Sequence, residues 1–194
     1  MRYQKQIYVC LFAVLTMATT CEGDDFEPYY PKNAHGIPEY KWLVTVSAES
    51  FQKNVIGEGW KWTRSSRITD EGQEERLFFQ ESNGYPADYF FTADSVTKFI
   101  YKQEGNTRQC ATYVYDEKEN LLTSPLIKYM QVCNLGPNSL TVVEYSETYG
   151  YCVTDYERMM PFELNARLLG SKLVEEWGGF CSCCLLSVRS SLAG

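Results

Sequence analysis

Closely spaced carboxylates and a single histidine are the first candidates for acid–base chemistry in this 194-residue chain. Glu74 with Glu75, and Glu117 with Glu119, could supply the two carboxyl groups of a glycoside hydrolase. The second pair falls in an expected hairpin loop, where charged residues usually serve solubility. His35 lies in a proline-rich stretch, where a solvated side chain is expected rather than a positioned general base. The sequence has no Gly-rich phosphate loop, G-x-S-x-G or H-E-x-x-H motif, so we predict that the protein is not an enzyme and needs no cofactor.

Six cysteines follow the N-terminal region. Cys110, Cys133 and Cys152 fall in three different expected strands, so a disulfide between two of them is one interpretation and buried free thiols are the other. The three cysteines within 181–184 lack the C-x₂-C spacing and the neighbouring histidine that are typical of zinc sites. We therefore predict no metal site.

The composition is that of an acidic, packed domain. The chain has 18 Lys and Arg against 25 Asp and Glu, and its net charge of -7 has the wrong sign for a nucleic-acid-binding surface. Hydrophobic residues make up 44% of the chain and aromatic residues 15%, which is too apolar for a disordered protein. At this length we expect one folded domain and no nucleic-acid partner.

The first 25 residues have the pattern of an export signal. Two basic residues precede an uncharged apolar run at 7–18 that is too short for a membrane span. Cys21 follows small residues and resembles the lipidated cysteine of a bacterial lipobox, and the acidic residues 22–25 resemble the surface-export signal of Bacteroides-like lipoproteins. We expect 1–20 to be a signal peptide, Cys21 to carry the lipid, and 21–40 to be an acidic tether of an outer-membrane protein at the cell surface. The alternatives are an ordinary cleaved signal with a chance cysteine and a retained helix.

Alternation of apolar and polar residues predicts a mainly β domain over 41–170. Ser47 is the expected N-cap of a short helix, and Pro161 begins a second one at 161–169. No helix of crossover length separates the strands, so we expect an antiparallel up-and-down barrel of about eight strands. The residues at 171–194 fit this pattern poorly, and we expect them to form a poorly packed, cysteine-containing tail. The strand-like segments are 59–68, 75–80, 88–92, 96–101, 108–115, 127–135, 139–146 and 150–155.

Five short stretches between residues 47 and 169 carry a family resemblance. They are FQKNVIGEGW at 51–60, YFF at 89–91, YDE and NL within 115–121, NSLT at 138–141 and YERM at 156–159. Together they resemble the lipocalin-like lipoproteins of Bacteroides-type bacteria. The resemblance implies a lipocalin-like barrel in which Trp60 and Arg158 pair at one end, with the guanidinium over the indole. A buried core tryptophan with an exposed arginine is the alternative.

The interior of such a barrel decides between two functions. An eight-stranded barrel can be filled by side chains or can hold one small ligand. We predict a non-enzymatic surface protein, joined to the membrane by its lipid, that binds a small hydrophobic or glycan-derived ligand. The alternative is a structural or adhesion lipoprotein with a filled barrel that contacts another protein. The aromatic candidates for the wall are Trp62, Tyr89, Phe91, Phe99, Tyr101, Tyr113, Tyr115, Tyr129 and Tyr145.

Overall fold

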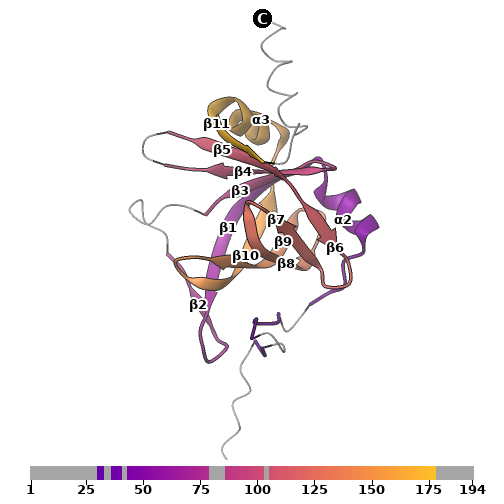
Figure 1. The fold of residues 1–194 in the computed structure, drawn as a ribbon, viewed down its shortest axis with the longest axis vertical. Coiled ribbons are helices and arrows are strands. Elements are labelled where there is room, and N and C mark those ends of the chain that lie inside the picture. Colours follow the sequence, from indigo (N-terminus) through magenta and orange to yellow (C-terminus); the bar gives the residue numbers. More distant parts are fainter. Residues whose placement is uncertain (1–29, 33–35, 41–42, 79–85, 103–104, 178–194) are drawn as a thin grey trace, which may run out of the picture.

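The computed structural model describes residues 30–32, 36–40, 43–78, 86–102 and 105–177. In these ranges the protein is mainly β, with two short helices and one strongly curled sheet (Figure 1). The expected signal peptide at 1–20, Cys21, His35 and the cysteines within 181–184 lie outside the described residues. None of the described helices combines the length and the apolar character that crossing a membrane requires.

Helix α2, Ala48–Val55, begins where the sequence predicts. The Ser47 side chain accepts a hydrogen bond from the Ser50 backbone N–H at 3.1 Å, which satisfies one of the donors that a helix start leaves unpaired. Phe51 and Val55, four residues apart, are both buried. The helix therefore packs on the sheet through one face.

Helix α3, Pro161–Gly170, follows the last long strand, and a side chain from another part of the sheet binds its C-terminal end. Arg108 is buried, and its guanidinium donates to the Leu168 carbonyl at 2.6 Å and to Ser171. A cation at a helix C-terminus is favourable because the last carbonyls carry partial negative charge. Figure 1 shows α3 beside the part of the sheet from which Arg108 comes.

The sheet contains all eleven strands of the described residues. Its order is β11-β5-β4-β3-β1-β10-β9-β8-β7-β6, with β2 pairing with β1 alone. Every neighbouring pair is antiparallel except β11 with β5. The strands are β1 Gly59–Ile68, β2 Glu74–Arg76, β3 Asp88–Phe91, β4 Ser95–Ile100, β5 Thr107–Thr112, β6 Val114–Asp116, β7 Leu121–Ser124, β8 Ile127–Leu135, β9 Ser139–Ser146, β10 Gly150–Arg158 and β11 Lys172–Trp177.

One short stretch of the chain connects the two ends of the curled sheet. Strands β5 and β6 are separated by Tyr113 alone, yet β5 pairs with β4 and β6 pairs with β7. One extended segment therefore serves both ends of the curled sheet. The sequence predicts this segment as a single strand at 108–115, and the structure divides it at Tyr113.

Alternate residues separate two packed faces. The larger hydrophobic cluster joins α2 to side chains of seven strands and lies within the curl; it includes Phe51, Val55, Trp60, Phe91, Leu122, Val132, Leu140 and Val142. The smaller cluster contains Val143 and Val153 together with Tyr30, which precedes the domain. Because Val142 and Val143 are consecutive in one strand, they belong to opposite faces, and the second cluster lies on the outer face.

The turn before β7 and the start of β1 both depend on close backbone contacts. Asn120 has a positive φ of 51°, and its side chain accepts from the Val46 N–H at 3.1 Å and donates to the Val44 carbonyl at 3.0 Å. A Cβ on Gly59 would lie 2.8 Å from the Met159 Sδ. These contacts tie the segment before α2 to the turn that precedes β7, and the end of β10 to the start of β1.

Three elements differ from the sequence-based predictions. Strand β2 ends at Arg76, so the predicted strand at 75–80 is shorter at Leu77 and Phe78, and its last two residues lie outside the described residues. Strand β7 is not predicted at all. The sequence predicts no strand after residue 170, whereas Lys172–Trp177 pair with β5 as β11; the poor packing of the tail stays a prediction.

Candidate functional site

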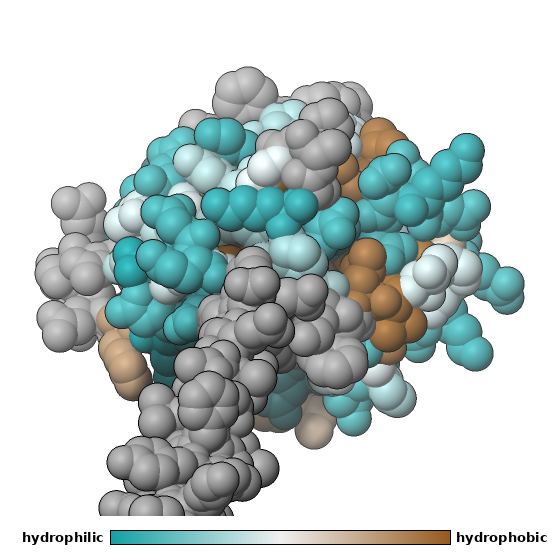
Figure 2. Space-filling model, turned by 90° about the horizontal axis from the view of Figure 1, so that it is seen from below, coloured by the Kyte–Doolittle hydropathy of each residue, from teal (hydrophilic) through white to brown (hydrophobic). Residues whose placement is uncertain are grey.

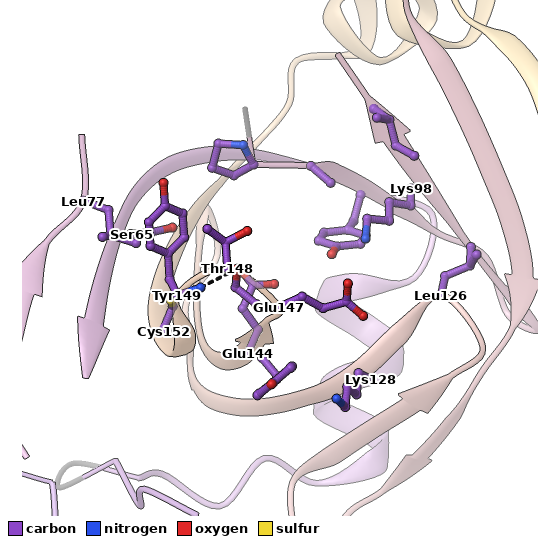
Figure 3. A pocket seen from close by; sticks show the side chains of 16 residues that line it. Ser65, Leu77, Lys98, Leu126, Lys128, Glu144, Glu147, Thr148, Tyr149 and Cys152 are labelled. Atoms are coloured by element: carbon purple, nitrogen blue, oxygen red, sulfur yellow. Dashed lines mark hydrogen bonds between the residues drawn. The ribbon is translucent and has the colours of Figure 1, made fainter. Parts of the chain in front are cut away.

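A pocket of about 430 Å³ lies in the curled sheet, toward the ends of the strands away from α2. The register of the sheet gives this position, since Trp60 and Leu140 lie near α2 whereas Ser65, Glu144 and Cys152 lie further along the same strands. The volume suits a small molecule. Figure 3 shows Lys98 and Lys128 along one side of the pocket and Tyr149 on the opposite side, with Glu144 and Glu147 between them.

Glu144 faces the pocket because it continues the interior row of β9. Leu140 and Val142 belong to the cluster within the curl, and Glu144 follows at the same two-residue spacing. The polar side chain therefore replaces the apolar one at the point where the core ends. The half-buried carboxylate accepts from the Tyr156 hydroxyl, at 3.2 Å to Oε1 and 3.3 Å to Oε2.

A row of hydrogen-bonded side chains leads toward Glu144. The Trp62 indole N–H donates to the Ser65 Oγ at 2.9 Å, and Ser65 lies 3.0 Å from the Thr154 Oγ1. Thr154 is in turn hydrogen-bonded to the Glu144 carboxylate. Either hydroxyl of the Ser65–Thr154 pair can donate to the other.

Burial and hydrogen bonding act on Glu144 in opposite directions. Burial raises the pKa of Glu144 above its ordinary value of 4.5, while the hydrogen bonds from Thr154 and Tyr156 and the charge of Lys98 lower it. The pKa is raised overall, so desolvation is the larger effect.

Lys98 and Tyr89 form the polar part of the other side of the pocket. They are register partners on β4 and β3, so their side chains share one face of the sheet. Lys98 is half-buried, and within the described residues no carboxylate lies within the 4 Å of an ion pair from its ammonium. Tyr89 is buried, and burial raises the pKa of its hydroxyl well above the usual range, which keeps it a neutral donor. Both groups are available to a ligand.

Apolar side chains complete the wall, and charged ones surround the mouth. Lys128 lies on the rim with its Nζ 4.1 Å from the Tyr145 ring centre, a cation–π contact. The Tyr149 N–H donates to the Ser146 Oγ at 3.3 Å, which fixes the loop that follows β9 (dashed in Figure 3). The apolar lining residues are Leu77, Pro86, Ala87, Ile100 and Leu126.

The structure distributes the predicted wall aromatics over several environments. Of these residues, Tyr89 and Tyr145 line the pocket. Trp62, Phe91, Tyr113 and Tyr115 instead pack in or against the core that α2 closes. Tyr129 packs against the outer cluster, Phe99 is buried, and Tyr101 donates to Asp88 at 2.6 Å. Two of the nine candidates therefore line the pocket, and four others face the same interior but fill the core near α2.

Lys98, Glu144 and Ser65 are pocket residues that sequence reasoning missed. Charged side chains are usually placed on the solvent face of a strand. The alternation along β9 could have identified Glu144. It follows Leu140 and Val142 at two-residue spacing, so it faces the same side of the strand as they do.

Trp60 and Arg158 lie together at the end of the sheet near α2. They are register partners on β1 and β10, and the Arg158 guanidinium carbon is 5.7 Å from the centre of the Trp60 ring. Trp60 is fully buried, and Arg158 is half-buried. Arg158 also donates to the Asn54 carbonyl at 2.9 Å and to Glu58 at 3.2 Å. It thus joins the last turn of α2 to the first and last long strands.

The two carboxylate pairs named in the sequence analysis do not line the pocket. Their contacts are with neighbouring elements of the fold. Glu74 accepts from the Tyr30 hydroxyl at 2.5 Å, and Glu75 pairs with Arg67. Glu117 accepts from the Ala48 N–H at 3.0 Å, at the start of α2. These contacts give the carboxylates roles in packing and surface pairing.

The cysteines within the sheet do not bridge to one another. Cys133 and Cys152 are buried free thiols, and burial raises the pKa of each to about 12. Cys110 is disulfide-bonded. Among the described residues no group of three or more His, Cys, Asp or Glu could hold a metal ion.

Comparison with known proteins gives one structural likeness. No family model matches the sequence, and no curated protein matches it. The chain is structurally similar to a lipocalin-like protein from Bacteroides uniformis, with 14% sequence identity and a TM-score of 0.38, over 55% of this chain and 99% of that one. The description of the site depends on the pocket residues themselves.

Proposed function

We propose that the protein binds a small molecule in this pocket and is not an enzyme. The observation that supports the proposal is the change within one interior surface, from a packed core near α2 to a 430 Å³ pocket with polar groups at its other end. Half-buried Lys98 and Glu144 both line this cavity, and a small number of polar groups in a partly apolar cavity is typical of ligand recognition.

The proposed framework is an up-and-down, lipocalin-like barrel. If 107–116 counts as one strand and β2 and β11 are set aside, eight strands follow one another around the curl: β1, β3, β4, β5 with β6, β7, β8, β9 and β10. A barrel of this number has an interior just wide enough for side chains or one small ligand.

The test is binding of a neutral apolar fluorophore, N-phenyl-1-naphthylamine, to the purified protein. We expect saturable binding at one site per chain, and loss of that binding in Ala87→Trp, which places a large ring in the pocket. Val114→Trp is the matched control, because Val114 is 69% exposed and does not line the pocket. Absence of binding, or equal binding by both variants, would contradict the proposal.

A lipid anchor at Cys21 is the second part of the proposal. It is supported by the basic start, the apolar run at 7–18 and the acidic residues after Cys21. The protein would then work at the outer membrane, facing the cell surface. The mass of membrane-extracted protein tests this: we expect a chain that begins at Cys21 and carries acyl groups, and an unacylated product from Cys21→Ala. An unacylated wild-type chain would refute the anchor.

An adhesion role is the alternative, and the outer face supplies an observation for it. Tyr129 and Tyr151 pack against the outer cluster with ring centres 5.5 Å apart, and the Tyr151 ring also lies 5.3 Å from that of the pocket residue Tyr145. Aromatic residues are enriched at protein interfaces. The face drawn in Figure 2 is mostly hydrophilic, with separate hydrophobic patches, whereas the pocket combines apolar walls with a few polar groups. The ligand-binding role is therefore preferred.

A further inference from the structure

The charges that line the pocket compensate one another, and this bears on the charge of the ligand. Lys98 acts electrostatically on the Glu144 carboxylate, although within the described residues no ion pair joins them. Lys128 and Glu147 are a second pair of opposite sign in the lining (Figure 3). An anion drawn to Lys98 would also lie near Glu144, and a cation drawn to Glu144 would lie near Lys98. The site therefore favours a ligand without formal charge.

Three polar groups of the pocket would lose their water to a purely apolar ligand. Lys98 and Tyr89 line the cavity and form no hydrogen bond in the part of the chain that the structure describes. Tyr156 and Thr154 are hydrogen-bonded to the Glu144 carboxylate, which has room for about four donors in all. Hydrocarbon laid over these groups would leave them unpaired, which is unfavourable. A complementary ligand therefore supplies both acceptors and donors.

Hydroxyl groups meet this requirement, because each one both donates and accepts. A hydroxyl near Lys98 and Glu144 can accept from the ammonium and donate to the carboxylate, and such bonds to charged groups are stronger than neutral ones. Tyr89 is the register partner of Lys98, so the two side chains share one face of the sheet. A second hydroxyl beside the first can therefore reach Tyr89. Several adjacent hydroxyls on one ring fit these positions.

A sugar ring also carries C–H groups, which suit the apolar residues of the lining. Ala87, Ile100 and Leu126 line the same cavity as the polar groups. The volume of about 430 Å³ lies within the range of small-molecule pockets. The cavity thus combines room for such a ring with contacts for both its polar and its apolar atoms.

We infer that the pocket binds a neutral sugar or a comparable polyhydroxylated ring, whose adjacent hydroxyls accept from Lys98 and Tyr89 and donate to Glu144. This inference rests on the proposed small-molecule binding and names the class of the ligand.

Displacement of N-phenyl-1-naphthylamine by phenyl glycosides at pH 7 tests the inference. The neutral probes are phenyl β-D-glucopyranoside, phenyl β-D-galactopyranoside and phenyl α-D-mannopyranoside. The control is 2-phenoxytetrahydropyran, which has the same ring without hydroxyls. We expect the best glycoside to bind about tenfold more tightly than this control, because a tenfold difference corresponds to one good hydrogen bond to a charged group.

Two charged analogues of the glucoside test the preference for a neutral ligand. Phenyl β-D-glucuronide carries a carboxylate at carbon 6, and phenyl 6-amino-6-deoxy-β-D-glucopyranoside carries an ammonium there. Both should bind less tightly than the glucoside. In Lys98→Met, which leaves Glu144 uncompensated, the ammonium analogue should become the tighter of the two, and in Glu144→Gln the glucuronide should.

Removal of single donors tests the contacts themselves. Tyr89→Phe deletes a hydroxyl that has no partner among the described residues, so it should weaken the glycosides while leaving the affinity for 2-phenoxytetrahydropyran unchanged. Lys98→Met should weaken the glycosides by about tenfold. Lys128→Met, with its ammonium over the Tyr145 ring, is the matched control and should have a smaller effect.

The outcomes separate this inference from the proposed function. If the fluorophore binds but no glycoside exceeds 2-phenoxytetrahydropyran, the inference is wrong and the proposed function stands. The same holds if a charged analogue binds the unmodified protein more tightly than the glucoside, or if neither Tyr89→Phe nor Lys98→Met alters glycoside binding. If the fluorophore and every other probe fail to bind, the proposed function itself fails.

Discussion

Glu144 is a carboxylate that ends a row of core residues, and its environment has a consequence for stability. An unfolded carboxyl releases its proton near the ordinary pKa of 4.5, whereas burial raises the pKa of Glu144 in the folded protein. Between these two values the folded state binds more protons than the unfolded state. The contribution of Glu144 to stability therefore falls as the pH rises through that interval.

Replacing this carboxyl with an amide should reduce that dependence. In Glu144→Gln, we expect the free energy of unfolding to decline less than in the wild type from pH 4.5 upward to pH 7, as measured by urea titration at each pH. Glu147→Gln, at an exposed residue of the same pocket, is the control and should follow the wild-type curve. If the free energy of unfolding depends on pH in the same way in all three proteins, the pKa of Glu144 is not raised by folding.

Arg158 combines contacts that an ordinary surface arginine does not have. It donates to a helix carbonyl and to Glu58, and it covers the buried Trp60 ring. We expect Arg158→Met to lower the free energy of unfolding by about 1–3 kcal/mol, from lost charged hydrogen bonds and the cation–π contact.

The control for Arg158 is an exposed arginine on the same sheet that pairs with a carboxylate. Arg64 pairs with Asp155 at 2.9 Å, and its side chain is 50% exposed. Arg64→Met should cost less than about 1 kcal/mol, as is usual for exposed ion pairs. Urea denaturation of both variants measures the difference, and equal losses would mean that the Trp60 contact adds nothing.

At the scale of elements, α2 stabilises the end of the curled sheet through Phe51. This ring is stacked on Tyr115 with centres 4.2 Å apart and meets Phe91 edge-on at 6.2 Å. Phe51→Ala should lower the free energy of unfolding by about 3–5 kcal/mol, because it leaves a cavity between helix and sheet.

Phe162 on α3 is the matched residue for this test, since it is 72% exposed. Phe162→Ala is expected to change the unfolding free energy by about 0.5 kcal/mol or less. If Phe51→Ala is too unstable to purify, Phe51→Leu should still cost more than the control variant. Similar values for the two sites would show that α2 does not close the core.

Local sequence patterns were sufficient to predict the elements in which apolar residues recur at regular spacing. The helix at Ala48–Val55 was predictable from Ser47 and its two apolar residues, and the long strands were predictable from their alternation. Strand β7 has only four residues, of which Leu122 alone is buried. Strand β11 contains two consecutive glutamates and owes its position to pairing with β5, so a nonlocal contact decides it.

The candidate site was less predictable than the fold. Tyr89 and Tyr145 could be named from the aromatic pattern, but so could seven residues that do not line the pocket. Lys98 on β4 and Glu144 on β9 are charged residues that line one cavity, although three strands lie between β4 and β9 in the sheet, so the curl of the sheet brings them together. A sequence pattern fixes which face a residue occupies, whereas register decides what lies opposite.

At the scale of the whole molecule, β11 covers one edge of β5. An uncovered edge presents unpaired backbone groups that can pair with a second chain. We expect a chain ending at Ser171 to self-associate at concentrations where a chain ending at Trp177 is monomeric, as measured by light scattering. A monomeric shorter chain would show that this edge needs no cover.

The pairing of β1 with β10 also concerns how the protein is made. Ser65 and Thr154 are hydrogen-bonded neighbours, although 89 residues separate them in the chain. At translation rates of about 5–20 residues per second, the first long strand waits on the order of 5–20 s for this partner. Such distant pairings also slow folding itself. The nascent chain thus has an extended unfolded period, and the export proposed for residues 1–20 would fall within it.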